Sequence, residues 1–403
     1  MDKAIVFLFN EKSNCCACAA CLNVCPKNAI IMKEGEDGFL YPYININRCV
    51  QCGKCQQVCN YQNRINEDKP MSAYAGMAVD DEILKSSSSG GIFAILGRYV
   101  LNKGGVIYGC SLELYENGLR PEHIRIDSLS QLWKLQGSKY VQSNIGLIYR
   151  TVLKDLEKNK FVLFTGTPCQ IDALYGFLGQ KDYANLLTLD IICHGVPSEK
   201  MFADYLHVLQ NKLKGRIVSF SFRDKSDGWG LKGAVEFIDI KGNKKKRAIP
   251  ISLSSYYKLF LTSEIYRENC YTCKYAKYSR VGDITIGDYW GIEIEHPELL
   301  VKNGGPMDIK KGVSCILVNT KKGEDALKNI CNSLLIEKSS IEKIARHNNQ
   351  LRRPSTYTEK RQQIFMFYKK NGYEKVETWY YQSLGWKLYA YEVKYFVIRL
   401  FKR

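Results

Sequence analysis

Sixteen cysteines are the residues of this sequence best suited to chemistry, and eight of them form two copies of one spacing. Each copy reads C-x2-C-x2-C-x3-C, and the two runs are Cys15, Cys18, Cys21 and Cys25, and Cys49, Cys52, Cys55 and Cys59. In bacterial two-cluster ferredoxins, the fourth cysteine of each such run ligates the other cluster. We therefore predict one 4Fe-4S cluster on Cys15, Cys18, Cys21 and Cys59, and a second on Cys49, Cys52, Cys55 and Cys25.

Structural zinc is the alternative for these runs, but zinc sites take four ligands in two C-x2-4-C pairs. Two details depart from the ferredoxin pattern: Asn60 follows the second run where proline is usual, and Cys16 lies beside Cys15 as a competing thiol. Between the runs, segments 29–32 and 39–43 flank a turn rich in glycine and acidic residues. This pattern predicts a β-hairpin between the two cysteine loops.

Two further cysteines follow predicted strands. Strand 161–164 precedes Cys169, and strand 186–192 precedes Cys193 and His194. Parallel sheets bind ligands beyond the carboxyl ends of their strands, and neighbouring strands lie about 4.8 Å apart, so the two thiols can meet if the strands pair. With the pair Cys270 and Cys273 they make a third set of four thiols.

The residues alone leave other interpretations of this third set open. Cys169 can be a reactive thiol at a helix N-terminus, and Cys270 and Cys273 can be half of a zinc site. His194 is either a proton relay or a hydrogen-bonded loop histidine. The remaining cysteines, Cys16, Cys110, Cys315 and Cys331, are interpreted as buried or idle thiols.

The segment 86–91, four serines followed by two glycines, precedes a predicted helix over 92–101 and a strand over 106–108. Hydroxyl groups and glycines at a helix start offer N–H groups and a positive dipole end to a phosphate. The alternative is an ordinary loop. The sequence has neither G-x-G-x-x-G after a strand nor a G-x-x-x-x-G-K-[ST] loop, so standard nucleotide-binding folds are not indicated.

Several of these segments together resemble the family of coenzyme F420 hydrogenase/dehydrogenase beta subunits. The resemblance rests on Ser88–Gly91, on 136–143, on 165–170, on 192–195, and on Cys270 and Cys273 followed by 282–291. It covers about residues 70–345, behind a ferredoxin segment that many members also have. It implies bound FAD beside a 4Fe-4S cluster on Cys169, Cys193, Cys270 and Cys273. The implied flavin contacts are Ser88, Ser89, Gly90, Gly91, Lys139, Tyr140, Gln142, Thr165, Gly166 and Thr167.

The predicted fold class is α+β or α/β. We expect a two-cluster ferredoxin-like domain over 1–65 and a polar linker over 62–70. A mixed α/β flavin and iron-sulfur domain follows, with an N-terminal part over 70–160 and a C-terminal part over 161–345. A basic, aromatic helical tail is expected over 346–403.

Composition restricts the setting. A chain of 403 residues with 45% hydrophobic residues can bury a large core, so it is not a small disulfide scaffold. Residues 1–10 have no signal-peptide cleavage pattern, and no window of about 20 apolar residues exists. These features predict a reducing, cytoplasmic location.

The net charge of +17 is unevenly distributed. Residues 351–403 hold twelve Lys and Arg against four Asp and Glu, together with fourteen aromatic residues. This tail suits docking on the protein core, an acidic partner or a membrane surface. The run Lys244–Arg247 is predicted to be a solvated turn between strands 234–240 and 248–252.

The expected function is an iron-sulfur flavoprotein oxidoreductase that passes electrons between 4Fe-4S clusters and FAD. Its substrate is unidentified or is a deazaflavin-type coenzyme. The alternative is an electron-transfer subunit that serves a partner enzyme, and a nucleic-acid-binding protein with structural clusters is a remote third. The expected partner is a ferredoxin, a flavodoxin or a redox subunit, and no nucleic acid is expected.

Overall fold

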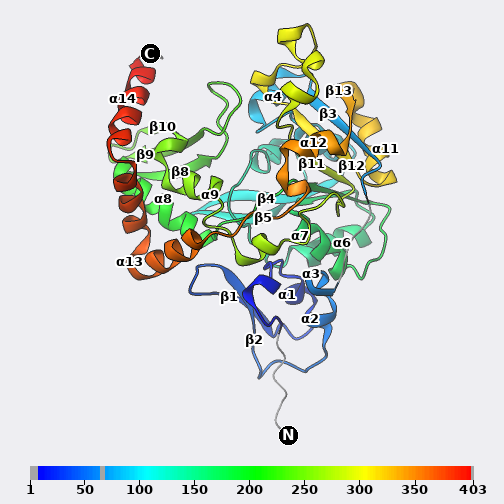
Figure 1. The fold of residues 1–403 in the computed structure, drawn as a ribbon. Coiled ribbons are helices and arrows are strands. Elements are labelled where there is room, and N and C mark those ends of the chain that lie inside the picture. Colours follow the sequence, from blue (N-terminus) through cyan, green and yellow to red (C-terminus); the bar gives the residue numbers. More distant parts are fainter. Residues whose placement is uncertain (1–7, 64–68, 401–403) are drawn as a thin grey trace.

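The computed structural model describes residues 8–63 and 69–400, which form three β-sheets with helices packed around them (Figure 1). Residues 1–7, which hold most of the N-terminal apolar stretch, residues 64–68 of the predicted linker, and residues 401–403 lie outside the described part. The sheets have two, three and eight strands. The protein is thus a mixed α/β protein, as the sequence predicts.

The two-stranded sheet belongs to the cysteine-rich N-terminal region. Strands β1 (Ile30–Glu34) and β2 (Leu40–Ile44) pair antiparallel, which confirms the predicted hairpin. The short helices α1 (Ala20–Val24), α2 (Lys54–Gln57) and α3 (Asn60–Asn63) complete this region.

The eight-stranded sheet has the order β13-β3-β12-β11-β7-β6-β4-β5. Its strands are β3 (Ser72–Ala78), β4 (Val106–Tyr115), β5 (Gly118–Ile126), β6 (Val162–Gly166), β7 (Leu186–Ile191), β11 (Ile284–Asp288), β12 (Ser314–Val318) and β13 (Leu334–Ser339). The four central strands β4, β6, β7 and β11 are parallel to one another, and the outer pairs are antiparallel. The predicted strands before Cys169 and Cys193 are therefore direct neighbours.

Successive residues of the central strands point to opposite faces, as a pleated sheet requires. Leu163 packs with α5 and α11, whereas Val162 and Phe164 pack with α6 and α7. The N-terminal region contributes to the second face, where Ala20 and Tyr61 join the same core. The helices around this sheet are α4 (Asp81–Ser86), α5 (Ile92–Asn102), α6 (Ile148–Glu157), α7 (Pro168–Phe177), α10 (Ile292–Glu295), α11 (Lys321–Ile330) and α12 (Ile341–His347).

The three-stranded sheet has a core of its own, rich in aromatic residues. It is built from α8 (Glu199–Leu213), β8 (Gly215–Ser221), β9 (Gly233–Asp239), β10 (Lys244–Ile249) and α9 (Ser255–Leu261). The predicted turn at Lys244–Arg247 is wrong, because these residues form most of edge strand β10. The turn lies just before them, where Gly242 adopts a left-handed conformation. Lysines on an edge strand discourage further strand pairing, and here they also pair with carboxylates such as Glu236 and Asp239.

The C-terminal tail forms α13 (Glu359–Leu384) and α14 (Trp386–Leu400). Side chains of α13, including Ile364, Tyr373 and Val376, belong to the core of the three-stranded sheet. This part of the tail therefore docks on the protein, whereas Trp386 and Tyr389 at the start of α14 are exposed. Across residues 8–63 and 69–400, no helix combines the length and apolar character needed to span a bilayer.

Candidate functional site

The two N-terminal cysteine loops have matching backbones. Ala17 and Ala19 adopt left-handed conformations in the first loop, and Gln51 and Gly53 do so at the equivalent positions of the second. In both loops, a short helix begins one residue after the second of these positions. Such alternation turns successive N–H groups toward one side of a loop, which is a geometry suited to an anionic centre.

The thiols of this region gather in the two predicted sets. Burial raises the pKa of Cys15, and the nearby Cys18 and Cys59 thiols raise it further. Cys21 also has the Cys15, Cys18 and Cys59 thiols as close electrostatic neighbours. The structure therefore places Cys59, from the second run, with three cysteines of the first.

The second set surrounds a small cavity of its own. Cys25, Cys49, Cys52 and Cys55 all line it. The backbone N–H of Ala29 donates to Cys25 Sγ at 3.2 Å, and that of Gln51 donates to Cys49 Sγ at 3.4 Å. Four thiols around one space, with N–H donors to sulfur, fit a cubane cluster.

The third set lies in the largest recess of the molecule. A cavity of about 420 Å³ opens at the carboxyl ends of the parallel strands, and Cys169, Cys193, Cys270 and Cys273 all line it. Cys169 is the second residue of α7, Cys193 follows β7, and the pair lies at a 3-10 turn, η4 (Glu268–Thr272). Distant segments thus supply four thiols to one wall, which fits a third cluster.

Electrostatics show that these four thiols are mutual neighbours. Burial raises the pKa of Cys193, with the other three thiols adding to the effect. Burial likewise raises the pKa of Cys270 to about 12 and that of Cys273 to about 11. In a buried set of this kind, a positively charged metal centre would hold the thiols as thiolates.

A single tetrahedral zinc ion would bring its thiolates within about 3.8 Å of one another. In the described part of the chain, no three His, Cys, Asp or Glu side chains have the geometry to hold one metal ion. A cubane cluster keeps its thiolates farther apart, so this arrangement is compatible with the cluster assignment.

The segments predicted to contact a flavin line the same cavity. The lining residues among them are Ser88, Ser89, Gly91, Lys139, Tyr140, Gln142, Thr165, Gly166 and Thr167. Gly90 lies behind this surface, where its N–H donates to Ser314 Oγ at 3.0 Å and an added Cβ would meet Gly76 O at 2.4 Å. His194 also lines the cavity, and its carbonyl accepts a hydrogen bond from Ser355.

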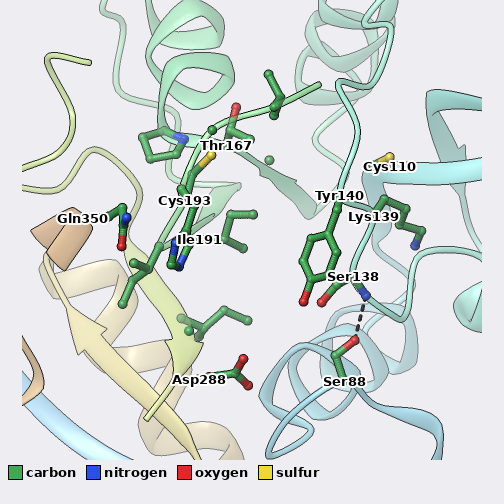
Figure 2. A pocket seen from close by; sticks show the side chains of 18 of the residues that line it. Ser88, Cys110, Ser138, Lys139, Tyr140, Thr167, Ile191, Cys193, Asp288 and Gln350 are labelled. Atoms are coloured by element: carbon green, nitrogen blue, oxygen red, sulfur yellow. Dashed lines mark hydrogen bonds between the residues drawn. The ribbon is translucent and has the colours of Figure 1, made fainter. Parts of the chain in front are cut away.

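Figure 2 shows the cavity between two walls, with Cys193 and Ile191 on one side and Ser138, Lys139 and Tyr140 on the other. The N–H of Ser138 donates to Ser88 Oγ at 2.7 Å, which ties the two predicted flavin segments together. Burial lowers the pKa of Lys139 to about 8. A mostly apolar cavity with few convergent polar groups suits a flat organic cofactor, so the residues present fit a flavin.

The N-terminal region meets the cavity through Cys16. The Cys16 thiol lies beside Cys18 of the first set and Cys169 of the third, and its hydrogen bond to Cys169 raises the pKa of Cys16. The Cys16 carbonyl accepts a hydrogen bond from Gln142 at 2.9 Å. Cys16 is therefore a buried residue between two thiol sets and does not displace Cys15 from the first loop.

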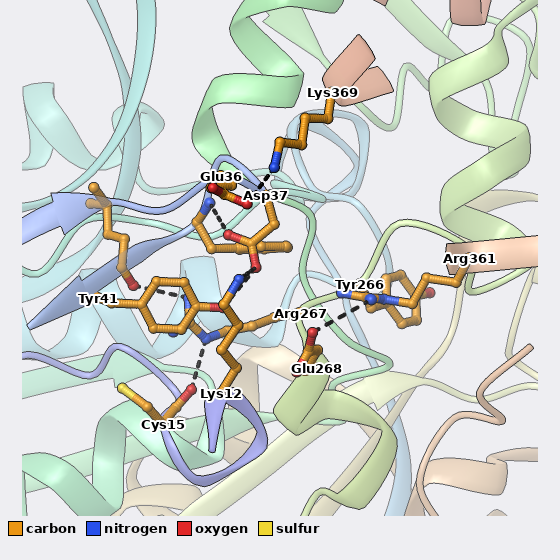
Figure 3. Close-up of polar contacts among 12 residues, drawn as sticks. Lys12, Cys15, Glu36, Asp37, Tyr41, Tyr266, Arg267, Glu268, Arg361 and Lys369 are labelled. Atoms are coloured by element: carbon orange, nitrogen blue, oxygen red, sulfur yellow. Dashed lines mark hydrogen bonds and ion pairs between the residues drawn. The ribbon is translucent and has the colours of Figure 1, made fainter. Parts of the chain in front are cut away.

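A buried arginine holds the same junction. Arg267 is fully buried, and its Nε donates to Cys15 O at 2.8 Å while its Nη1 donates to Leu40 O at 3.0 Å. Its guanidinium also lies 4.2 Å from the centre of the Tyr41 ring, as Figure 3 shows. Arg267 thus fixes the first cysteine loop and the β1–β2 hairpin to the turn that carries Cys270 and Cys273.

Two further contacts attach the N-terminal region to the sheet domain. Asn60, the residue that replaces the usual proline, donates from Nδ2 to Asp172 O at 2.7 Å in α7. Arg150 of α6 donates to the carbonyls of Asn23 at 2.7 Å and Cys25 at 2.9 Å. The departure at Asn60 therefore has a structural role at this contact.

Sequence reasoning missed several residues of the cavity. Asp288 and Trp290 follow β11, so the rule about carboxyl ends of parallel strands could have found them. Arg223 follows β8 of the other sheet, and no spacing pattern marks it. His123 is buried and bonded to Ser143 Oγ at 2.9 Å and Thr165 O at 3.0 Å.

Two family models match the chain. Residues 159–344 match the C-terminal domain described as coenzyme F420 hydrogenase/dehydrogenase, beta subunit. Residues 14–63 match a 4Fe-4S dicluster domain.

Similar proteins come from Methanosarcina and Methanocaldococcus. One subunit of the F(420)H(2) dehydrogenase of Methanosarcina mazei is 22% identical over 206 residues, which is 48% of this chain and 58% of that protein, so the match spans less than two thirds of that relative. An uncharacterized protein of Methanocaldococcus jannaschii is 23% identical over 351 residues, covering 79% of this chain and 87% of that one. One solved chain, from the F420-reducing [NiFe] hydrogenase complex of Methanosarcina barkeri, aligns with 74% of this chain and 92% of its own at 17% identity and a TM-score of 0.43.

The ordered motifs of the cavity and the cysteine runs fall within the two matched regions. The chain belongs to the family of coenzyme F420 hydrogenase/dehydrogenase beta subunits and carries an N-terminal 4Fe-4S dicluster domain.

Proposed function

We propose that this protein is an iron-sulfur flavoprotein oxidoreductase that passes electrons between 4Fe-4S clusters and FAD. The observation that supports this most is the shared cavity, whose walls hold both the third thiol set and the predicted flavin segments. Bound FAD would exchange two electrons with a substrate and single electrons with the clusters. The substrate class includes a deazaflavin-type coenzyme, which the names of the relatives suggest.

The residues of the chain have distinct tasks in this proposal. Cys169, Cys193, Cys270 and Cys273 hold the third cluster. Thr167 orients the first of these thiols, because its Oγ1 lies 3.1 Å from Cys169 Sγ and it also caps α7. Lys139 supplies a buried cation, fixed by the Gln136 carbonyl at 2.8 Å.

Order along the chain of sites comes from the junction. Cys16 lies between Cys18 of the first set and Cys169 of the third, so the first ferredoxin cluster would be the one next to the cavity. The second set, around the cavity of Cys25 and Cys49, would be the outer site. An external one-electron carrier is therefore expected to approach near Cys52, which is exposed.

The test is anaerobic reconstitution of the full chain with iron, sulfide and FAD, followed by metal, sulfide and flavin analysis. We expect about twelve irons and one FAD per chain. Finding about four irons and no flavin absorbance would rule the proposal out. A screen of electron donors and acceptors on the reconstituted protein would then define the substrate.

An electron-transfer subunit is the second candidate, and the observation that favours it is that one relative is named as a dehydrogenase subunit. In that case the flavin would pass electrons only when a partner enzyme is present. Stopped-flow reduction of the flavin by candidate substrates distinguishes the two: direct reduction of the isolated chain supports the enzyme, and its absence supports the subunit.

A further inference from the structure

One end of the cavity carries buried donors that have no acceptor. In the described part of the chain, Arg223 Nε, Arg223 Nη2 and Trp229 Nε1 are buried and make no hydrogen bond. The Arg223 side chain is only 2% exposed, and the residue lines the cavity. Buried donors are normally paired, so three of them in two neighbouring residues indicate a place for a ligand.

The third nitrogen of the guanidinium is fully used, and this fixes the orientation of the other two. Arg223 Nη1 donates to Asp288 Oδ2 at 2.8 Å and to Tyr140 Oη at 3.1 Å. Nε and Nη2 form the opposite edge of the planar group. Two parallel N–H groups on that edge match the two oxygens of a carboxylate or a phosphate.

Aromatic rings surround this edge. The Arg223 guanidinium lies 5.4 Å from the Trp229 ring, and Trp229 lies 4.8 Å from Trp290, which lines the cavity. These rings keep water from the guanidinium and offer a flat apolar surface to a ligand. A bidentate anion contact is stronger in such surroundings than in open solvent.

The local charge also favours an anion. Asp288 balances the charge of Arg223, but the Lys225 ammonium lies close to both. Lys225 Nζ donates to uncharged carbonyls, among them Ser89 O at 2.6 Å and Leu84 O at 2.8 Å. Two cations against one carboxylate leave a net positive charge for a ligand to neutralise.

We propose that Arg223, with Trp229 and Trp290 beside it, forms an anion-binding subsite that holds a carboxylate or phosphate group at the end of the cavity. Two sources share this chemistry: the diphosphate of FAD and an anionic group of the substrate. Ser89 connects the subsite to the predicted flavin segment, because its carbonyl accepts from Lys225. The FAD source rests on the proposed function, whereas the subsite itself does not.

The first experiment asks whether the subsite exists. Inorganic phosphate is titrated into the full chain without added FAD, and binding is followed by tryptophan fluorescence and by the shift in Tm. Arg223→Gln should raise the phosphate Kd by about tenfold or more, because it removes the charged bidentate edge. Arg223→Lys, which keeps the charge but not the edge, should lie between Arg223→Gln and the unaltered protein.

The matched control is Arg361→Gln. Arg361 is also a buried arginine with an unpaired Nη2, but it donates to Tyr266 O at 2.9 Å and lies outside the cavity lining. This variant should bind phosphate as the unaltered protein does. Asp288→Asn provides a change in the opposite direction, since loss of the balancing carboxylate should strengthen phosphate binding.

The second experiment identifies the source of the anion. If the FAD diphosphate occupies the subsite, Arg223→Gln weakens FAD binding by about tenfold or more and leaves riboflavin binding unchanged. If a substrate group occupies it, FAD binding is unchanged, while benzoate binds the FAD-loaded protein in an Arg223-dependent way and neutral benzamide does not. The subsite is overturned if Arg223→Gln equals the unaltered protein for phosphate, FAD and benzoate, whatever the flavin content.

Discussion

The cysteines of the dicluster domain and those of the cavity wall reach their sites in different ways. In the dicluster domain, each loop supplies three thiols within seven residues, and left-handed residues such as Ala17 and Gln51 set the backbone. In the cavity, Cys169 and Cys193 come from neighbouring parallel strands, and the other two come from a turn more than 75 residues later. The first site is local in sequence, and the second depends on the whole sheet.

This difference has a consequence for stability. A loop that folds around its own cluster depends mainly on the metal, as small metal-binding domains do. The cavity wall depends on buried packing of β6 and β7 and on the contacts at Cys16 and Arg267. Damage to the fold should therefore affect the third thiol set before it affects the first two.

The largest expected effect comes from removing a thiol of the cavity wall. Cys193→Ser should reduce the iron content from about twelve to about eight per chain and leave the two dicluster signals in the EPR spectrum. Cys110→Ser, which alters a cavity residue outside the three sets, should keep all the iron. An unchanged iron content in Cys193→Ser would contradict the different construction of the two regions.

A pH effect should appear in the cavity domain through His123. Burial lowers the pKa of His123 to about 4, so between pH 6.5 and 4 the unfolded chain takes up a proton that the folded chain does not. The free energy of unfolding should fall by up to about 3 kcal/mol across that window. His123→Gln should flatten this fall in urea denaturation, while a change at exposed His207 should not.

A retained slope in the His123→Gln variant would show that other groups set the acid sensitivity. At pH values above the unfolded pKa, both states hold neutral histidine, so the depressed pKa adds no pH dependence there.

The contact between the two regions should respond to Asn60. Asn60→Ala removes the hydrogen bonds from Nδ2 to the Asp172 carbonyl and carboxylate, at 2.7 and 3.0 Å. We expect a loss of about 2 kcal/mol in the free energy of unfolding. The neighbouring exposed residue Gln62 provides the control, since its side chain faces Leu8. Equal stability of Asn60→Ala and the unaltered protein would separate the contact from folding.

The smallest effect is expected on a redox potential. Arg267 places a buried positive charge beside Cys15, and it lowers the pKa of both Cys15 and Cys270 against the larger effect of burial, which raises them. Arg267→Gln should lower the midpoint potential of the nearest cluster by on the order of 50 mV, because a reduced cluster gains negative charge. Lys12→Gln, at the more exposed ion pair with Asp37 in Figure 3, should change it less. Potentiometric titration followed by EPR measures both, and equal shifts would refute the role of burial.

Much of the fold could be predicted because its signals are local. The hairpin between the cysteine runs, the strands before Cys169 and Cys193 and the helix after Gly91 all appear where the pattern placed them. The prediction for Lys244–Arg247 failed because a run of lysines reads as a solvated turn, whereas an edge strand also leaves them in solvent.

The sequence by itself determined the dicluster motif, since the spacing of eight cysteines dictates loops that wrap a cluster. It also determined the order of the cavity segments along the chain. Only the tertiary structure decided that Cys16, Gln142 and Arg267 meet at one junction, and that Arg223 from a separate sheet faces the cavity. The physical reason is that these contacts join residues far apart in the chain, and packing of whole sheets and helices, not local spacing, brings them together.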